Sequence, residues 1–133
     1  MKRILVVDDS TTILKFVEGI LQDHYKVALV KSGELALAYL KENKVDMVLL
    51  DIFMPVMDGF ETFQKIKEME PKCEVPVVFF TSGVEAEIEI RALAMGAKDF
   101  IRKPFDCLFI QSHFTASQNL LSGLLNLLVA LFL

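Results

Sequence analysis

Residues 47–59 of the chain read MVLLDIFMPVMDG and combine a strand pattern, a carboxylate and a helix start. Its first four residues form a short, continuous apolar run, which is typical of a strand buried on both faces of a parallel sheet. Asp51 follows the run directly, so we expect a carboxylate at the carboxyl end of that strand. Asp58 and Gly59 close the stretch with a turn and an N-cap, which predict the start of a helix.

Similar apolar runs recur along the chain, separated by helical patterns. The runs are residues 4–7, 27–30, 77–80 and 100–101. The helical faces between them are Ile13, Phe16, Val17, Ile20 and Leu21 after an N-cap at Ser10; Leu35, Ala36 and Leu40 after Ser32; Phe60, Phe63 and Ile66; and Ile88, Ala92 and Met95 before Gly96. This alternation predicts an α/β fold: a flavodoxin-like, doubly wound, five-stranded parallel sheet of order 2-1-3-4-5 with helices on both faces.

Length and composition exclude several classes of protein. The chain has 133 residues, 53% of them hydrophobic, which allows one packed domain and excludes intrinsic disorder. A net charge of -4 argues against direct binding of nucleic acid or of an anionic membrane. Cys73 and Cys107 lie far apart, which favours a reduced intracellular compartment. No secretory signal is visible near Lys2 and Arg3, and we expect a cytoplasmic protein.

Polar residues follow four of the predicted strands at their carboxyl ends. They are Asp8 and Asp9, Asp51, Thr81, and Lys103. Ligands of open parallel sheets bind at this edge, where the strand order reverses. If strands 1 and 3 flank that point, the three carboxylates meet, and the hydroxyl and the ammonium approach from the next two strands.

This combination of residues indicates phosphoryl transfer. Clustered carboxylates repel one another unless a cation or protons intervene, and hard oxygen ligands favour Mg²⁺ or another divalent cation such as Mn²⁺. A carboxylate can also attack phosphorus to form an aspartyl phosphate. Lys103 and Thr81 would bind the phosphoryl oxygens.

With these residues the chain resembles the receiver domains of two-component response regulators. The motifs are VVDDS (6–10), LLDIFMPVMDG (49–59), FFTSG (79–83) and DFIRKPF (99–105), and the likeness covers roughly residues 1–106. The resemblance implies a phosphoprotein of a phosphorelay: a sensor histidine kinase or phosphotransfer protein donates the phosphoryl group, and a downstream protein target reads the result.

The resemblance also implies roles for individual residues. Asp51 corresponds to the phosphoacceptor and Asp9 to a metal ligand, while Asp8 is a ligand or an acid one step removed from the metal. The backbone carbonyl of Phe53 completes the protein ligands.

Three further residues resemble the switch and phosphate-binding positions of the family. Thr81 corresponds to the switch hydroxyl, Lys103 to the phosphate-binding lysine and Phe100 to the switch aromatic. Phosphorylation would then change the face formed by helix 4, strand 5 and helix 5. We expect the Phe100 ring to lie mainly inward even before phosphorylation, because phenylalanine lacks the hydroxyl of a tyrosine and its outward state exposes more apolar area.

Three other functions remain as alternatives. A phosphatase of the haloacid-dehalogenase type would need a second Asp two residues after the nucleophile, where this chain has Phe53. Flavin binding is disfavoured because Asp8 and Asp9 put negative charge where a phosphate would lie. A degenerate, non-phosphorylated domain is disfavoured because the whole constellation is intact. We therefore expect a regulator that catalyses only its own phosphorylation and dephosphorylation.

The last segment departs from the family pattern. Residues 120–133 read LLSGLLNLLVALFL, without any charge, so we divide the chain into a receiver domain at 1–119 and an apolar, helical extension at 120–133. Such a helix would be about 21 Å long, shorter than the hydrocarbon core of about 30 Å, which disfavours a membrane span. We expect self-association, a homodimer formed through the C-terminal helix.

Overall fold

In a computed structural model of the chain, the structure describes residues 2–69, 74–81 and 86–102. Strands and helices alternate through these residues. They are β1 (Arg3–Val7), α1 (Thr11–Leu21), β2 (Lys26–Val30), α2 (Gly33–Glu42), β3 (Met47–Leu50), α3 (Gly59–Lys67), β4 (Val77–Thr81), α4 (Ala86–Ala94) and β5 (Asp99–Arg102). The predicted extension at residues 120–133 lies outside the described part.

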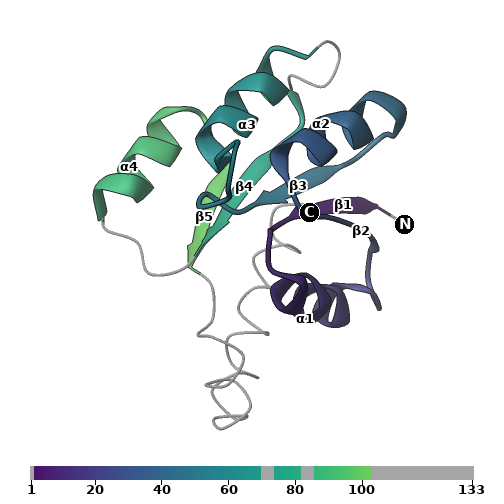
Figure 1. The fold of residues 1–133 in the computed structure, drawn as a ribbon. Coiled ribbons are helices and arrows are strands. Elements are labelled where there is room, and N and C mark those ends of the chain that lie inside the picture. The colour runs from purple at the N-terminus through teal and green to yellow at the C-terminus, as the bar shows by residue number, and fades with distance from the viewer. Residues whose placement is uncertain (1, 70–73, 82–85, 103–133) are drawn as a thin grey trace, which may run out of the picture.

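The strands form one parallel sheet of order β2-β1-β3-β4-β5, so the predicted topology is confirmed. Helices α2, α3 and α4 lie on one face of the sheet and α1 lies on the other (Figure 1). The strand order reverses between β1 and β3, which are direct neighbours with Val7 in register with Leu50. The carboxyl ends of these two strands therefore meet.

A hydrophobic core lies on each face of the sheet. On the side of α2, α3 and α4, the rings of Phe60 and Phe63 pack against Phe79 of β4, with centroids 5.4 Å and 5.6 Å apart. On the side of α1, Val17 and Leu21 pack over the inner strands and are fully buried. β1 and β3 carry only buried side chains from Ile4 onward, as their continuous apolar runs predicted.

The helix starts lie where the sequence predicts them. The Ser10 hydroxyl accepts the Ile13 N–H at 3.3 Å, the Ser32 hydroxyl accepts that of Leu35 at 3.1 Å, and Asp58 Oδ1 accepts that of Glu61 at 2.9 Å. The predicted apolar face of α2 was wrong in one residue. Leu35 is 53% exposed, whereas Ala36 and Leu40 are fully buried. No helix within the described ranges combines the length and apolarity needed to cross a membrane.

Candidate phosphorylation site

Three carboxylates meet at the carboxyl ends of β1 and β3. One ligand oxygen from each of Asp8, Asp9 and Asp51 lies within 4.8 Å of the others. Asp8 follows β1 and Asp51 follows β3, and the register of the two strands places these residues side by side. The structure thus brings together the three acids that the sequence predicted.

The Asp51 carboxylate has a defined orientation at the end of β3. Its backbone N–H donates to the carbonyl oxygen of Val7 at 2.9 Å, which continues the pairing of β1 and β3. Its Oδ1 accepts the N–H of Ile52, also at 2.9 Å. The residue is only 4% exposed, so the carboxylate lies in a largely desolvated position next to Asp8.

Asp8 is held by β2 and by the turn that follows β1. Its backbone N–H donates to the Val30 carbonyl of β2 at 3.1 Å, and its Oδ1 accepts the Ser10 N–H at 2.9 Å. This second bond closes the turn that leads from β1 into α1. Asp8 is 1% exposed and Asp9 is exposed, so the cluster has two buried carboxylates and one that faces solvent.

The loop of residues 51–58, here called the acceptor loop, is pressed against the start of α3. The Gly59 N–H donates to the Ile52 carbonyl at 2.7 Å. A β-carbon at Gly59 would overlap the Asp51 carbonyl oxygen and lie 2.7 Å from the Ile52 α-carbon, so only glycine allows this approach.

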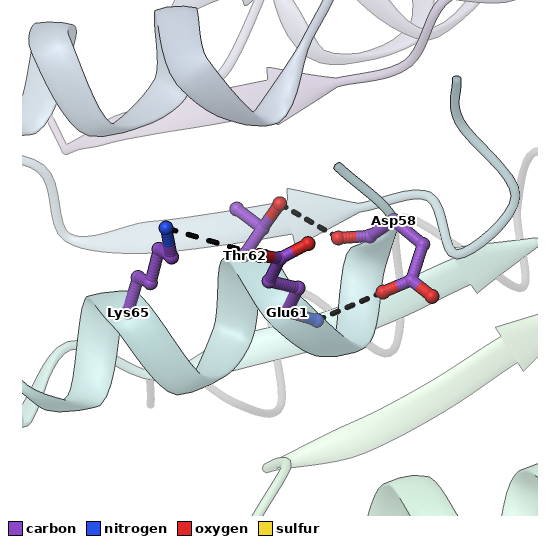
Figure 2. A network of polar contacts seen from close by, with 4 residues as sticks. All are labelled: Asp58, Glu61, Thr62 and Lys65. Carbon is purple, nitrogen blue, oxygen red and sulfur yellow. Dashed lines mark hydrogen bonds and ion pairs between the residues drawn. The ribbon is translucent and has the colours of Figure 1, made fainter. Parts of the chain in front are cut away.

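The first turn of α3 is held by a small polar network (Figure 2). Asp58 Oδ1 accepts the Glu61 N–H, and the Asp58 carbonyl accepts the Thr62 hydroxyl at 2.8 Å. The carboxylate of Glu61 also lies 3.8 Å from the Lys65 ammonium. The cap predicted at Asp58 is therefore confirmed, and Thr62 reinforces it from within the helix.

The remaining predicted site residues are described to different extents. Phe53 lies in the acceptor loop with its side chain 58% exposed. Thr81 is the last residue of β4 and pairs with Arg102 of β5. Phe100 is 8% exposed and belongs to the core beneath α4, which agrees with the inward ring that we expected. Lys103 lies outside the described residues.

The donor set fits a divalent cation. Three carboxylates within 4.8 Å of one another concentrate negative charge, and two of them have little access to water. Burying such charges is costly unless a cation or protons offset them. Oxygen ligands of this kind suit Mg²⁺ or Mn²⁺, so the residues present match the metal that the sequence predicted.

Two residues that pack beside the acceptor loop were not identified from the sequence. Gly33 at the start of α2 and Thr62 in α3 lie in contact across the two helices. The glycine after the Ser32 cap was the available signal, because glycine within a helix costs about 0.5–1 kcal/mol relative to alanine and often marks a close approach of a neighbouring group.

Residues 4–113 match the family model described as "Response regulator receiver domain". The fold resembles that of the chemotaxis protein CheY4 of Vibrio cholerae, with a TM-score of 0.74 and 30% identity over 87% of this chain and 98% of that one. It also resembles the BeF3-activated receiver domain of DrrB, with a TM-score of 0.69 and 32% identity over 87% and 96% of the two chains.

Curated relatives match over most of this chain but over little of their own length. A protein-glutamate methylesterase/protein-glutamine glutaminase of Paramagnetospirillum magneticum is 38% identical over 77% of this chain and 28% of its own. A probable cyclic di-GMP phosphodiesterase of Vibrio cholerae is 36% identical over 83% and 25%. The chain therefore spans about a quarter of the length of these relatives.

Proposed function

The chain belongs to the family of response regulator receiver domains, two-component modules that are phosphorylated on an aspartate, and we propose that Asp51 is its phosphoacceptor. The observation that carries this proposal is the position of Asp51. It follows β3 at the switch point of the sheet and is buried beside Asp8 and Asp9. Asp58 lies outside this cluster and caps α3.

The proposed reaction is an in-line transfer from a phosphohistidine. A carboxylate oxygen of Asp51 attacks the phosphorus, the O–P bond forms and the P–N bond breaks. The leaving imidazole keeps the electron pair of that bond and is neutralised by a proton. The Ile52 N–H, which donates to Asp51 Oδ1, holds the carboxylate in one orientation during the attack.

Asp8, Asp9 and Asp51, with the backbone carbonyl of Phe53, are the proposed ligands of Mg²⁺ or Mn²⁺. Receiver domains bind a divalent cation in their acidic pocket, and the carboxylate cluster supports the same site here. A bound cation would offset the negative charge of the carboxylates and of the phosphoryl oxygens. Asp8 and Asp51 are held by backbone hydrogen bonds, so little reorganisation is needed for binding.

Thr81 and Lys103 are the proposed partners of the phosphoryl oxygens, and Phe100 is the proposed switch aromatic. Thr81 and Phe100 lie on the neighbouring strands β4 and β5. Phosphorylation at Asp51 would draw the Thr81 hydroxyl toward the phosphate. The space that it leaves would let the Phe100 ring settle further inward and change the face that includes α4 and β5.

The proposed partners follow from this chemistry. A sensor histidine kinase or a phosphotransfer protein would donate the phosphoryl group in the cytoplasm, and a downstream protein would bind the phosphorylated form. We propose no direct binding of nucleic acid, because the net charge is -4. We propose that the chain acts as a regulator that catalyses only its own phosphorylation and dephosphorylation.

Mass spectrometry after incubation with acetyl phosphate and Mg²⁺ tests the proposal. We expect one adduct of about 80 Da, located on Asp51 and labile to hydroxylamine. The matched control is Asp58→Asn, which removes a nearby exposed carboxylate outside the cluster and should keep the adduct. An adduct that persists in Asp51→Asn would refute the assignment. Continuous release of phosphate would favour the phosphatase alternative.

A further inference from the structure

The first turn of α3 is packed between the acceptor loop and the first residue of α2. Helices α2 and α3 lie side by side on one face of the sheet (Figure 1). Gly59 of α3 touches the backbone of Asp51 and Ile52 on one side. On the other side, Thr62 of the same turn faces Gly33 of α2. The first turn of α3 therefore connects the start of α2 with the backbone of Asp51.

Gly33 leaves no room for a side chain at this contact. A β-carbon there would overlap the Thr62 Oγ1 atom and lie 2.8 Å from the sulfur of Met57 in the acceptor loop. Real β-carbons do not approach other atoms so closely. Either Thr62 would have to turn its hydroxyl out of this contact and the Met57 side chain would have to shift, or the backbone of α3 or of the loop would have to move. The conformation of glycine is not the reason, because the Ser32 cap and the helical start suit other residues equally well.

The Thr62 hydroxyl makes a hydrogen bond in addition to the regular backbone bonds of the helix. The residue is fully buried, and its Oγ1 donates to the Asp58 carbonyl at 2.8 Å. The same carbonyl already accepts the backbone N–H of Thr62 at 3.0 Å, the ordinary helical bond. The hydroxyl therefore adds a second bond to the residue that ends the acceptor loop, and its oxygen is the atom against which Gly33 packs.

We propose that Gly33 and Thr62 are positioning residues for phosphorylation: their contact holds the first turn of α3 against the acceptor loop and so sets the place of the Asp51 carboxylate. The proposal rests on the proposed role of Asp51. The path is short. The Asp58 carbonyl is bound by Thr62, the Gly59 N–H binds the Ile52 carbonyl at 2.7 Å, and the Ile52 N–H binds Asp51 Oδ1 at 2.9 Å.

The test compares Gly33→Ala with Gly19→Ala in the full chain. Gly19 lies in α1, and a β-carbon there meets no atom within 4 Å, so it is a matched control. The readouts are the Mg²⁺ dissociation constant by calorimetry and the rate of Asp51 phosphorylation by acetyl phosphate at saturating Mg²⁺, with folding checked by circular dichroism. We expect Gly33→Ala to slow phosphorylation by about tenfold, since a displacement of 1 Å can cost about 100-fold. Gly19→Ala should match the wild type.

A rescue experiment separates positioning from simple loss of stability. Thr62→Ala removes the atom that the new methyl group overlaps, together with the hydroxyl that binds the Asp58 carbonyl. Gly33→Ala should therefore slow phosphorylation less in the Thr62→Ala background than in the wild type. A folded Gly33→Ala protein with wild-type Mg²⁺ affinity and rate, or an equal effect of Gly33→Ala in the two backgrounds, would overturn the proposal.

A second pair of variants applies if Gly33→Ala does not fold. Thr62→Val keeps the volume but loses the hydroxyl, and Thr62→Ser keeps the hydroxyl. We expect slow phosphorylation in Thr62→Val and a near wild-type rate in Thr62→Ser, and equal rates in the two would also overturn the proposal. Failure of the proposed function is distinguishable, because the wild type itself would then carry no phosphoryl group on Asp51.

Discussion

Val56 is a strained residue in the acceptor loop. Its φ of 69° lies in the left-handed region, which β-branched residues rarely adopt, and its side chain is 95% exposed. The strain costs about 1–2 kcal/mol, and burial of the valine offsets almost none of it. We predict that Val56→Gly stabilises the domain by about 1 kcal/mol, because glycine removes the strain but loses about 0.5–1 kcal/mol of backbone entropy.

Thermal or urea unfolding checks this prediction. Val56→Ala is the control, because alanine keeps a β-carbon and therefore most of the strain. An increase in melting temperature for glycine but not for alanine is expected. Equal melting temperatures for the two variants would show that the loop relaxes around Val56 at no cost.

Asp9 is the solvent-facing member of the carboxylate cluster. Its replacement should remove the stabilising effect that Mg²⁺ has on the folded domain. A cation that binds only the folded state stabilises it by about 1.4 kcal/mol at about ten times its dissociation constant. We predict that Asp9→Ala removes most of the Mg²⁺-dependent rise in melting temperature. The control is Asp23→Ala, an exposed acid in the turn after α1. An undiminished rise in Asp9→Ala would contradict the assigned role as ligand.

For single residues, the sequence predicts which acidic side chains meet better than it predicts the contacts that hold them in place. Asp8, Asp9 and Asp51 could be predicted to meet, because parallel strands end at a common edge. The contact of Gly33 with Thr62 could not be predicted, since it depends on how closely α2 and α3 pack. The left-handed conformation of Val56 was missed for a related reason: nothing in the local sequence favours it, and the surrounding loop imposes it.

At the scale of elements, periodicity and caps predict most of the structure. Continuous apolar runs became strands within one residue of their predicted ends at residues 4–7, 27–30, 47–50 and 77–80. The exception among the helices is instructive. In α2 the buried stripe is carried by Ala36 and Leu40, one turn apart, and Leu35 lies beside that stripe. Which of several apolar side chains faces the sheet depends on the rotation of the helix, which only packing decides.

Helix α4 is joined to α3 by an aromatic contact next to the acceptor loop. The guanidinium of Arg91 lies 4.1 Å from the centre of the Phe60 ring, and Phe60 follows Gly59 directly. Among the described residues of α4 only Ala92 is fully buried, while Ile90 and Leu93 are 66% and 45% exposed. Ala92 and the partly buried Ile88 attach this helix to the core, and the Arg91–Phe60 stack adds a contact with α3.

We predict that Arg91→Met lowers the stability of the domain by about 0.5–1 kcal/mol and increases hydrogen exchange of the α4 amides, since a partly exposed cation–π pair is worth about that much. The measurement is a double-mutant cycle with Phe60→Leu. Once the ring is gone, Arg91→Met should have little further effect. If the two variants are additive, the stack contributes nothing to the attachment of α4.

At the scale of the whole molecule, the described helices cover the two faces of the sheet unequally. Three of them lie on one face, and α1 alone lies on the other, packed on β1 and β2 (Figure 1). A helix about 10 Å wide covers about two strands spaced about 4.8 Å apart. Val78 and Phe80 of β4, on the α1 side, are nevertheless core residues. The core on the α1 side therefore extends across the sheet from β2 as far as β4.

The last prediction concerns residues 120–133, which lie outside the described part of the structure. Covering one face of a sheet requires one apolar stripe, yet no Lys, Arg, Asp or Glu follows Asp106, and residues 120–133 are apolar around nearly the whole helical circumference. Such a surface exceeds what a soluble monomer exposes, so we predict self-association through this segment. Light scattering should show oligomers that dissociate on dilution. Full-length Leu124→Glu with Leu128→Glu, or a chain ending at Asn119, should be monomeric. If the unaltered chain is monomeric at high concentration, residues 120–133 fold back onto their own domain instead.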